Sequence, residues 1–281
     1  MYHLCIGEAV VPTPKIKFIP VDINADINTI INAHRIITQR LKVMSFIDYV
    51  EDSYNDFLKY KETITHPNLH SDITLERKAR AYFNEFDIFL DHWKKYMSFR
   101  DKKNEFSSVF DKETHEAFDN SSDYALATII RNYAAHQADV IQGKFWGGKN
   151  YYDVGCSKSV LLQDKSLNET KRKVVQDQPA QFISLSPIMR NSLIELKAMH
   201  QVFLKFDIDP DDIASAQQLT ELIESIANLG LTEKHLYFVN DIKTPLTVYS
   251  ADNTPLETVF ATEQIPFNYK EYLHVLEYLS Q

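Results

Sequence analysis

Apolar residues recur three or four positions apart through most of the chain, which is the spacing of one face of an α-helix. Each such stripe predicts a helix that buries its apolar face and leaves its polar face in solvent. The stripes cover residues 27 to 44 with an extension toward 58, then 82 to 97, 126 to 133, 188 to 203, and 219 to 226. A last short helix is predicted over residues 269 to 279.

Turn and capping residues separate these stripes into individual helices. Pro67 interrupts the pattern, because proline lacks the backbone N–H that a helix interior requires. Ser121 or Ser122 provides an N-cap for the helix that follows. Gly143 belongs to a glycine-containing loop after that helix, and Gly230 closes a later one.

Short strands are predicted at both ends of the chain. Ile16 and Phe18 alternate with Lys15 and Lys17, which is the period of a strand. Prolines on both sides confine this strand to a short or edge position. Near the other end, strands are predicted over residues 235 to 239, 246 to 250 and 257 to 260.

These patterns together predict a mainly α fold, a helical bundle with small β elements at the N- and C-termini. The chain has only six glycines in 281 residues, which suits packed helices better than a loop-rich β protein. We expect an N-terminal strand segment over residues 1–25, a helical bundle over 26–205, and a C-terminal helix and β-hairpin extension over 206–281.

The charge balance limits the partners that the chain can bind. A formal net charge of −9 argues against broad, non-specific binding to nucleic acids, which depends on neutralising phosphates with Lys and Arg. A local basic cleft is compatible with this charge. Two basic clusters occur, and solvated helix ends or loops are the simpler interpretation of each. The first cluster comprises Lys94, Lys95, Arg100, Lys102 and Lys103, and the second comprises Lys171, Arg172 and Lys173.

The cysteines and the apolar segments predict the compartment. Cys5 and Cys156 are the only cysteines, so we expect no disulfide framework and a reducing environment. The first residues lack the basic start and apolar run of a secretory signal. No stretch is long and apolar enough to span a bilayer. The sequence therefore predicts a cytoplasmic protein with no membrane partner.

Sequence motifs of several common enzyme classes are absent. The Gly-Lys pairs at Gly143 and Gly148 lack the upstream glycine of a phosphate-binding loop, and no nucleophile elbow is present. His66 and His70 are four residues apart, but Pro67 lies between them, so they need not share a helical face. The sequence therefore predicts neither a metal site nor a cofactor.

One predicted helix carries residue types that suit a catalytic site, in the segment RNYAAH at residues 131–136. Asn132 and His136 are four residues apart and only about 40° around the helix axis, so they are neighbours on one face. Arg131 lies about 140° from His136, too far for contact within one helix. Two copies of the chain about a twofold axis could bring both Arg–His sets into one cleft.

The run FDNSSDYALATIIRNYAAHQ, with the aromatic-rich segment YFNEFDIFLDHWKKYM upstream, resembles the signature region of the HEPN superfamily of helical bundles. It is similar in particular to bacterial HEPN-like proteins with an RNY-x-x-H core. The resemblance is good over residues 75 to 145 and looser over the later helices. It does not extend to the N-terminal strands or to the last seventy residues. The sequence departs from the common core at Ala135, where a larger polar residue is frequent.

The resemblance implies a metal-independent endoribonuclease with RNA as substrate and a homodimer as the active form. It also implies a role as a toxin or phage-defence effector, with a neutralising antitoxin or regulatory protein as a possible partner. His136 would take the proton of the 2′-hydroxyl, and its copy would protonate the leaving oxygen. Arg131 would bind the phosphate, and Asn132 would orient the phosphate or the imidazole. The product would be a 2′,3′-cyclic phosphate, and DNA should not react.

Simpler roles stay open for each of these residues. Arg131 can instead pair with a carboxylate such as Asp91 on the neighbouring helix, and His136 can cap or pack. Asp91 and Tyr133 are candidates for supporting the site, although Tyr133 continues the apolar stripe and suits the core better. Two other functions therefore remain, a non-catalytic HEPN-like module that binds a nucleotide or protein partner, and a purely structural helical protein.

Overall fold

The chain folds into two compact units in the computed structural model. The terminal unit combines Met1–Met44 with Ile208–Gln281, and the central unit is Ser45–Asp207. The two ends of the chain therefore fold together. The structure describes residues 2–10, 15–20, 26–136, 139–146, 152–231, 236–240, 244–249, 255–261, 264–267 and 269–280.

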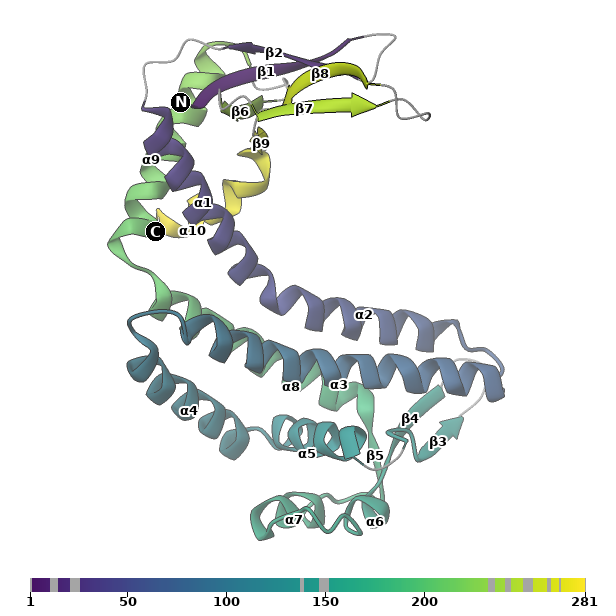
Figure 1. Cartoon of the computed structure of the whole chain (residues 1–281). Coiled ribbons are helices and arrows are strands. Elements are labelled where there is room, and N and C mark those ends of the chain that lie inside the picture. The colour runs from purple at the N-terminus through teal and green to yellow at the C-terminus, as the bar shows by residue number, and fades with distance from the viewer. Residues whose placement is uncertain are drawn as a thin grey trace. The chain divides into compact units, whose positions relative to one another are not determined.

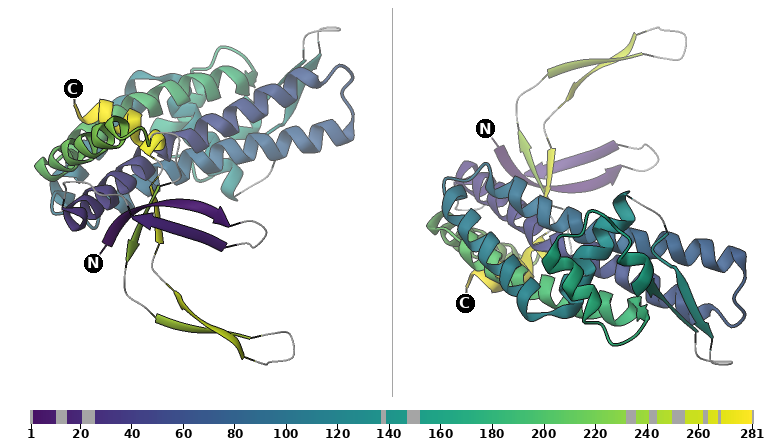
Figure 2. Two further views of the ribbon diagram at one scale, coloured as in Figure 1. Left: turned by 90° about the horizontal axis from the view of Figure 1, so that it is seen from above. Right: turned by 90° about the horizontal axis from the view of Figure 1, so that it is seen from below.

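Long helices form the body of the central unit (Figure 1). Helices α2 and α3 run side by side, as Figure 2 also shows, and α5 packs against α3, α4 and α8. The 3-10 turn η1 (Ser45–Ile47) precedes α2. The helices are α2 (Asp48–Thr63), α3 (Leu69–Met97), α4 (Lys103–Asn120), α5 (Ser122–His136) and α8 (Leu185–Asp207).

Helix α3 starts just after the interruption at Pro67. Its N-cap residue Asn68 accepts a hydrogen bond from the backbone N–H of Ser71 at 2.9 Å. The Ser71 hydroxyl oxygen accepts one in return from the backbone N–H of Asn68, also at 2.9 Å. This reciprocal capping satisfies two N–H groups that the first helical turn cannot pair internally.

Large aromatic side chains fill the core of the central unit. Trp93 stacks with Phe106 at a ring separation of 5.9 Å and meets Phe203 edge-on at 5.4 Å. The indole Nε1–H of Trp93 donates to Nδ1 of His200 at 3.1 Å, so its polar atom stays paired although it is buried. Fully buried aromatic side chains are Trp93, Tyr82, Phe57, Phe83, Phe86, Phe89 and Phe203.

Helix α4 differs from the expected pattern, because the sequence predicted no helix between residues 97 and 121. This helix of 18 residues buries Phe106, Phe110 and Ala117 and leaves most of its surface in solvent. Three buried positions make too weak an apolar stripe to predict a helix from periodicity alone.

A small antiparallel sheet of order β3-β4-β5 completes the central unit, with β4 against α8. The sequence predicted a loop at Gly143, but β3 begins there. Gly155 is required in β4, because a Cβ at this position would lie 2.2 Å from the Ile183 carbonyl oxygen of β5. The elements are β3 (Gly143–Trp146), β4 (Tyr152–Ser157), β5 (Phe182–Ser184) and the short helices α6 (Lys158–Leu161) and α7 (Glu169–Gln176).

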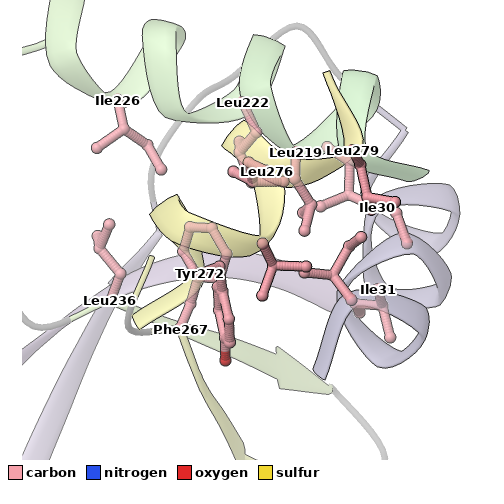
Figure 3. Packing of buried hydrophobic residues seen from close by; sticks show 14 residues of the cluster. Ile30, Ile31, Leu219, Leu222, Ile226, Leu236, Phe267, Tyr272, Leu276 and Leu279 are labelled. Atoms are coloured by element: carbon pink, nitrogen blue, oxygen red, sulfur yellow. The ribbon is translucent and has the colours of Figure 1, made fainter. Parts of the chain in front are cut away.

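The terminal unit is built on apolar faces of α1 (Ile27–Met44), α9 (Pro210–Asn228) and α10 (Leu273–Leu279), drawn in Figure 3. Asp209 caps α9 by accepting from the backbone N–H of Asp212 at 3.1 Å. Buried core residues include Ile30, Ile31, Ile37, Leu219, Leu222, Ile226, Leu236, Phe267, Tyr272, Leu276 and Leu279.

Antiparallel strands of order β2-β1-β6-β9 form the sheet of the terminal unit. Strand β1 pairs with β2 on one side and with β6 on the other, so the N-terminal hairpin joins the C-terminal segment. Strands β7 and β8 form a separate two-stranded sheet. The remaining elements are β1 (Tyr2–Val10), β2 (Lys15–Pro20), β6 (Leu236–Asn240), β7 (Thr244–Tyr249), β8 (Pro255–Ala261), β9 (Gln264–Phe267) and η2 (Tyr269–Tyr272).

The structure confirms the predicted fold class, mainly α with small β elements at both ends. The units do not follow the expected division of the chain, since their boundaries fall after Met44 and after Asp207. Helix α1 lies in the expected bundle segment 26–205 but packs against α9 of the terminal unit. In the described part of the chain, no helix has both the length and the apolar character needed to cross a membrane.

A partly buried ion pair links α2 to β4 in the central unit. Lys61 Nζ lies 3.0 Å from Asp153 Oδ1 and donates to Ser186 Oγ at 2.7 Å. We expect Lys61→Met to lower the free energy of unfolding by about 3 kcal/mol, because a buried carboxylate then lacks its cation. Urea unfolding measures the change, and Lys59→Met at an exposed position of α2 should cost less than about 0.5 kcal/mol. Equal costs for both variants would contradict this role.

The stability of the terminal unit should depend on the charge of His34. This side chain is buried, and its Nε2 lies 3.0 Å from the Tyr272 hydroxyl. Burial, with a contribution from the charge of Arg35, lowers the pKa of His34. The unfolded chain then binds more protons below about pH 6.5, so stability is highest above that pH and falls as the pH decreases toward the folded-state pKa.

Hydrogen exchange in α1 during urea titration, at pH 7.5 and at pH 5.5, tests this dependence. We expect the wild-type midpoint to fall at the lower pH. His34→Gln cannot be protonated, so its midpoint should fall less between the two pH values. The same decrease in both proteins would show that other groups cause the acid sensitivity.

Candidate functional site

Helix α5 carries the segment singled out by its sequence, and its buried face fixes its orientation. The Ser121 hydroxyl accepts a hydrogen bond from the backbone N–H of Tyr124 at 3.3 Å. Of the two predicted N-cap residues, Ser121 is therefore the one that caps the helix. The helix also packs against α7. The buried residues of α5 are Tyr124, Ala125, Leu126, Ala127, Ile129, Ile130 and Tyr133.

Arg131 lies at the surface between α5 and α3, where two side chains hold its guanidinium. Its Nη1 donates to Asp87 Oδ1 on α3 at 2.6 Å. The amide oxygen of the adjacent Asn132 accepts from Nη2 at 3.1 Å and from Nε at 3.3 Å. The predicted carboxylate partner was Asp91, but the observed one is Asp87, one helical turn earlier on α3.

The geometry leaves part of the Arg131 guanidinium available. A guanidinium has five N–H groups, and three hydrogen bonds to described residues use one on each nitrogen of Arg131. One N–H on Nη1 and one on Nη2 therefore have no partner among the described residues. Two N–H groups on the terminal nitrogens suit the oxygens of a phosphate or carboxylate. The side chain of Arg131 is partly exposed, at 21%.

The two tyrosines of this helix belong to its packing. Tyr133 is buried, in agreement with its place in the apolar stripe, and burial raises its pKa. Tyr124 is also buried, which raises its pKa, while the charge of Arg131 acts in the opposite direction. Both phenols therefore stay protonated near neutral pH.

His136 is the last residue of α5, and its side chain lies outside the described residues. Its backbone follows Asn132 by four positions, as expected for residues on one helical face. Ala135 is exposed, while Arg131 and Asn132 are partly exposed. The structure thus describes Arg131 and Asn132 together but does not describe the contacts of His136.

Asp91 is exposed on α3, and no hydrogen bond or ion pair links it to Arg131 among the described residues. The adjacent His92 contacts the ring of Phe46 at 5.2 Å. Described side chains also contain no group of three or more His, Cys, Asp and Glu arranged to hold a metal ion.

The C-terminal end of α5 is held by a network that the sequence analysis missed. Arg80 of α3 donates through Nη1 to the Ala134 carbonyl oxygen at 2.9 Å, which satisfies one of the last carbonyls of the helix. Glu76 accepts from Arg80 Nε at 2.8 Å. It also accepts from the backbone N–H groups of Val140 at 2.8 Å and Ile141 at 2.7 Å. One carboxylate of α3 therefore fixes both the arginine and the chain that follows α5.

Val140 is held on its other side by a buried thiol. Cys156 Sγ donates to the Val140 carbonyl oxygen at 3.0 Å. Burial raises the pKa of Cys156, so this thiol stays protonated and inert near neutral pH. No sequence motif identifies Glu76, Arg80 or Cys156, because each also binds a backbone group of another element, which no local pattern indicates.

Half of the residues in the two basic clusters are exposed on helices, and the others are partly buried. Lys94 and Lys95 are exposed in the last turn of α3. Arg100 differs, since its Nε donates to Asp207 Oδ1 at 3.2 Å inside the central unit. Arg172 on α7 donates through Nη1 to the Leu162 carbonyl oxygen at 2.8 Å.

No protein-family model, curated protein or solved structure matches this chain.

The Glu76 network gives a direct prediction for the end of α5. In Glu76→Gln, one of the two side-chain acceptors becomes an NH2 group, which cannot accept from the backbone N–H groups. We expect a loss of about 1–3 kcal/mol in local stability and faster hydrogen exchange at Val140 and Ile141. Exchange measured by mass spectrometry on peptides that contain these residues checks this. Glu85→Gln, elsewhere on α3, should leave their exchange unchanged.

Proposed function

We propose that this protein is a metal-independent endoribonuclease that acts as a homodimer, with Arg131, Asn132 and His136 at the catalytic site. The observation that carries the proposal is the arrangement at Arg131, whose guanidinium is held at the surface with two N–H groups left for a phosphate. The resemblance of the surrounding segment to the HEPN superfamily supports the same assignment.

The chemistry needs no metal, because RNA supplies its own nucleophile in the 2′-hydroxyl. A neutral His136 would accept the proton from that hydroxyl, and the same residue of a second copy would protonate the leaving 5′-oxygen. Arg131 would stabilise the charge that develops on the phosphate. Asn132 would keep the guanidinium in place, since its amide oxygen accepts two of the Arg131 N–H groups. The product would be a 2′,3′-cyclic phosphate.

The dimer follows from the rotation of residues along α5. Arg131 and His136 are about 140° apart around the helix axis, so one copy alone makes a poor site for one phosphate. A twofold arrangement would bring Arg131 of one copy near His136 of the other. Among the supporting candidates, Asp87 replaces Asp91 because it contacts Arg131, and Tyr133 has a packing role.

The biological setting follows from the same resemblance. An endoribonuclease of this kind would act in the cytoplasm as a toxin or phage-defence effector. A neutralising antitoxin or regulatory protein would then control it. The net charge of −9 makes recognition depend on a local set of cations, such as Arg131, and disfavours general attraction to RNA.

A second candidate is a non-catalytic helical module that binds a nucleotide or protein partner. The net charge of −9 favours it, because broad attraction to RNA phosphates is then weak. The ion pair between Arg131 and Asp87 within one chain favours instead a third candidate, a purely structural role. The side chain of Asp87 is 49% exposed, however, so the pair adds less than about 1 kcal/mol to stability. A purely structural role therefore accounts poorly for the placement of Arg131.

RNA cleavage by the purified full-length chain in EDTA tests the proposal. We expect cleavage of single-stranded RNA with a 2′,3′-cyclic phosphate end, and no cleavage of DNA. His136→Ala and Arg131→Ala should each lower the rate at least about a hundredfold. The exposed residues His115 and Arg190 provide matched controls, and their alanine variants should cleave at the wild-type rate.

Asp87→Ala separates catalysis from structure, because it breaks the same ion pair but keeps the Arg131 guanidinium. We expect this variant to retain cleavage within about tenfold, whereas Arg131→Ala loses it. Equal losses in the two variants would assign Arg131 a structural role. Activity that survives His136→Ala would place the reaction elsewhere or in a contaminant.

A further inference from the structure

A cavity of about 440 Å³ lies beside the N-terminal half of α3, next to the segment that follows α5. This volume is within the range of sites that hold small ligands, about 300–1,000 Å³. It adjoins the proposed catalytic helix, since Arg80 in its wall also binds the Ala134 carbonyl of α5. Its walls come from α3 and from residues 139 to 144.

Two of the acidic groups in this cavity are already used by the protein. Asp72 accepts from Lys144 Nζ at 2.5 Å and from the Tyr152 hydroxyl at 2.9 Å. Both oxygens of Glu76 accept backbone N–H groups, and one of them also accepts from Arg80. These two carboxylates are held in place by hydrogen bonds within the protein, so they are not available to a ligand.

The groups that remain available to a ligand are a cationic side chain, an anionic side chain and two exposed apolar side chains. Arg77 is exposed, and no described residue forms a hydrogen bond or ion pair with its guanidinium. The side chain of Asp139 is 81% exposed, with one oxygen 3.6 Å from Arg80. Leu69 is 75% exposed and Ile73 is 50% exposed, one turn apart on α3. A ligand with an anionic part, N–H donors and a flat apolar face would match all of them.

We infer that this cavity binds one nucleotide of a single-stranded RNA. Arg77 holds its phosphate, the base lies on Ile73 and Leu69, and Asp139 accepts an N–H of the base edge. This inference rests on the proposed function, because it adds a substrate subsite to the same catalytic surface.

The position of the cavity suits a strand that continues to the catalytic arginine. Ile73, Arg80 and Asp87 are seven residues apart in succession, so they lie along one face of α3. Arg77 and Asp87 are ten residues apart, which is about 15 Å along the helix axis. Asp87 holds Arg131, so a strand anchored at Arg77 reaches the Arg131 guanidinium within a few nucleotides.

Binding can be measured without cleavage. The probe is a fluorescein-labelled single-stranded RNA of about eight nucleotides and mixed sequence, with every 2′-hydroxyl methylated so that the strand cannot be cut. Fluorescence anisotropy with the full-length chain gives Kd at several salt concentrations. We expect Arg77→Ala to weaken binding about fivefold and to lower the slope of log Kd against log salt by about 0.7, the value for one phosphate contact.

Two further variants separate the parts of the subsite. Ile73→Ala should weaken binding about threefold with the salt slope unchanged, because it removes contact with a base and no charge. Lys78 is the residue next to Arg77, and it pairs with Asp56 outside the cavity. Lys78→Ala makes the same change in net charge and should alter Kd by less than about twofold.

The outcomes for the subsite and for the ribonuclease can be told apart. Wild-type affinity in Arg77→Ala, or no binding by the wild type, overturns the subsite whether or not unmodified RNA is cleaved. Arg77-dependent binding without cleavage upholds the subsite and removes the ribonuclease proposal. Competition by an oligoglutamate peptide as strong as that by RNA would show a general anion site and overturn the assignment to a nucleotide.

Discussion

Aromatic side chains packed along α3 fix the arrangement of the central unit. Tyr82, Phe86 and Trp93 are fully buried on this helix, and dense packing of such large groups allows α3 only one rotation about its axis. That rotation directs Glu76, Arg80 and Asp87 toward α5 and the chain after it. The core of the unit thus determines where the charged groups of the candidate site lie.

These charged groups differ in how firmly they are held. Glu76 accepts backbone N–H groups and an arginine, so its replacement leaves several partners unsatisfied. The pair of Arg131 and Asp87 is partly exposed and contributes little to stability. A ligand can therefore compete for Arg131 at small cost, while the end of α5 stays fixed. A fixed scaffold that carries a loosely paired cation suits the binding of a phosphate.

Much of this architecture could be predicted from the sequence, because local patterns specify it. The aromatic stripe predicted α3, Pro67 marked its start, and Ser121 was one of two predicted caps of α5. Helix α4 was missed because it buries few apolar residues, and β3 was missed because glycine at its first position indicated a loop. In both cases the tertiary contacts outweigh a weak local signal.

Helical periodicity in the sequence is enough to give the mainly α class of the fold and the buried position of Tyr133. Packing between elements decided which residues meet. Asp87, and not Asp91, contacts Arg131, and Glu76 and Arg80 hold the end of α5. This packing could not be predicted from the local pattern. It also decided that the two ends of the chain share one unit. The register between packed helices comes from how their side chains interlock, and no local pattern in the chain records this.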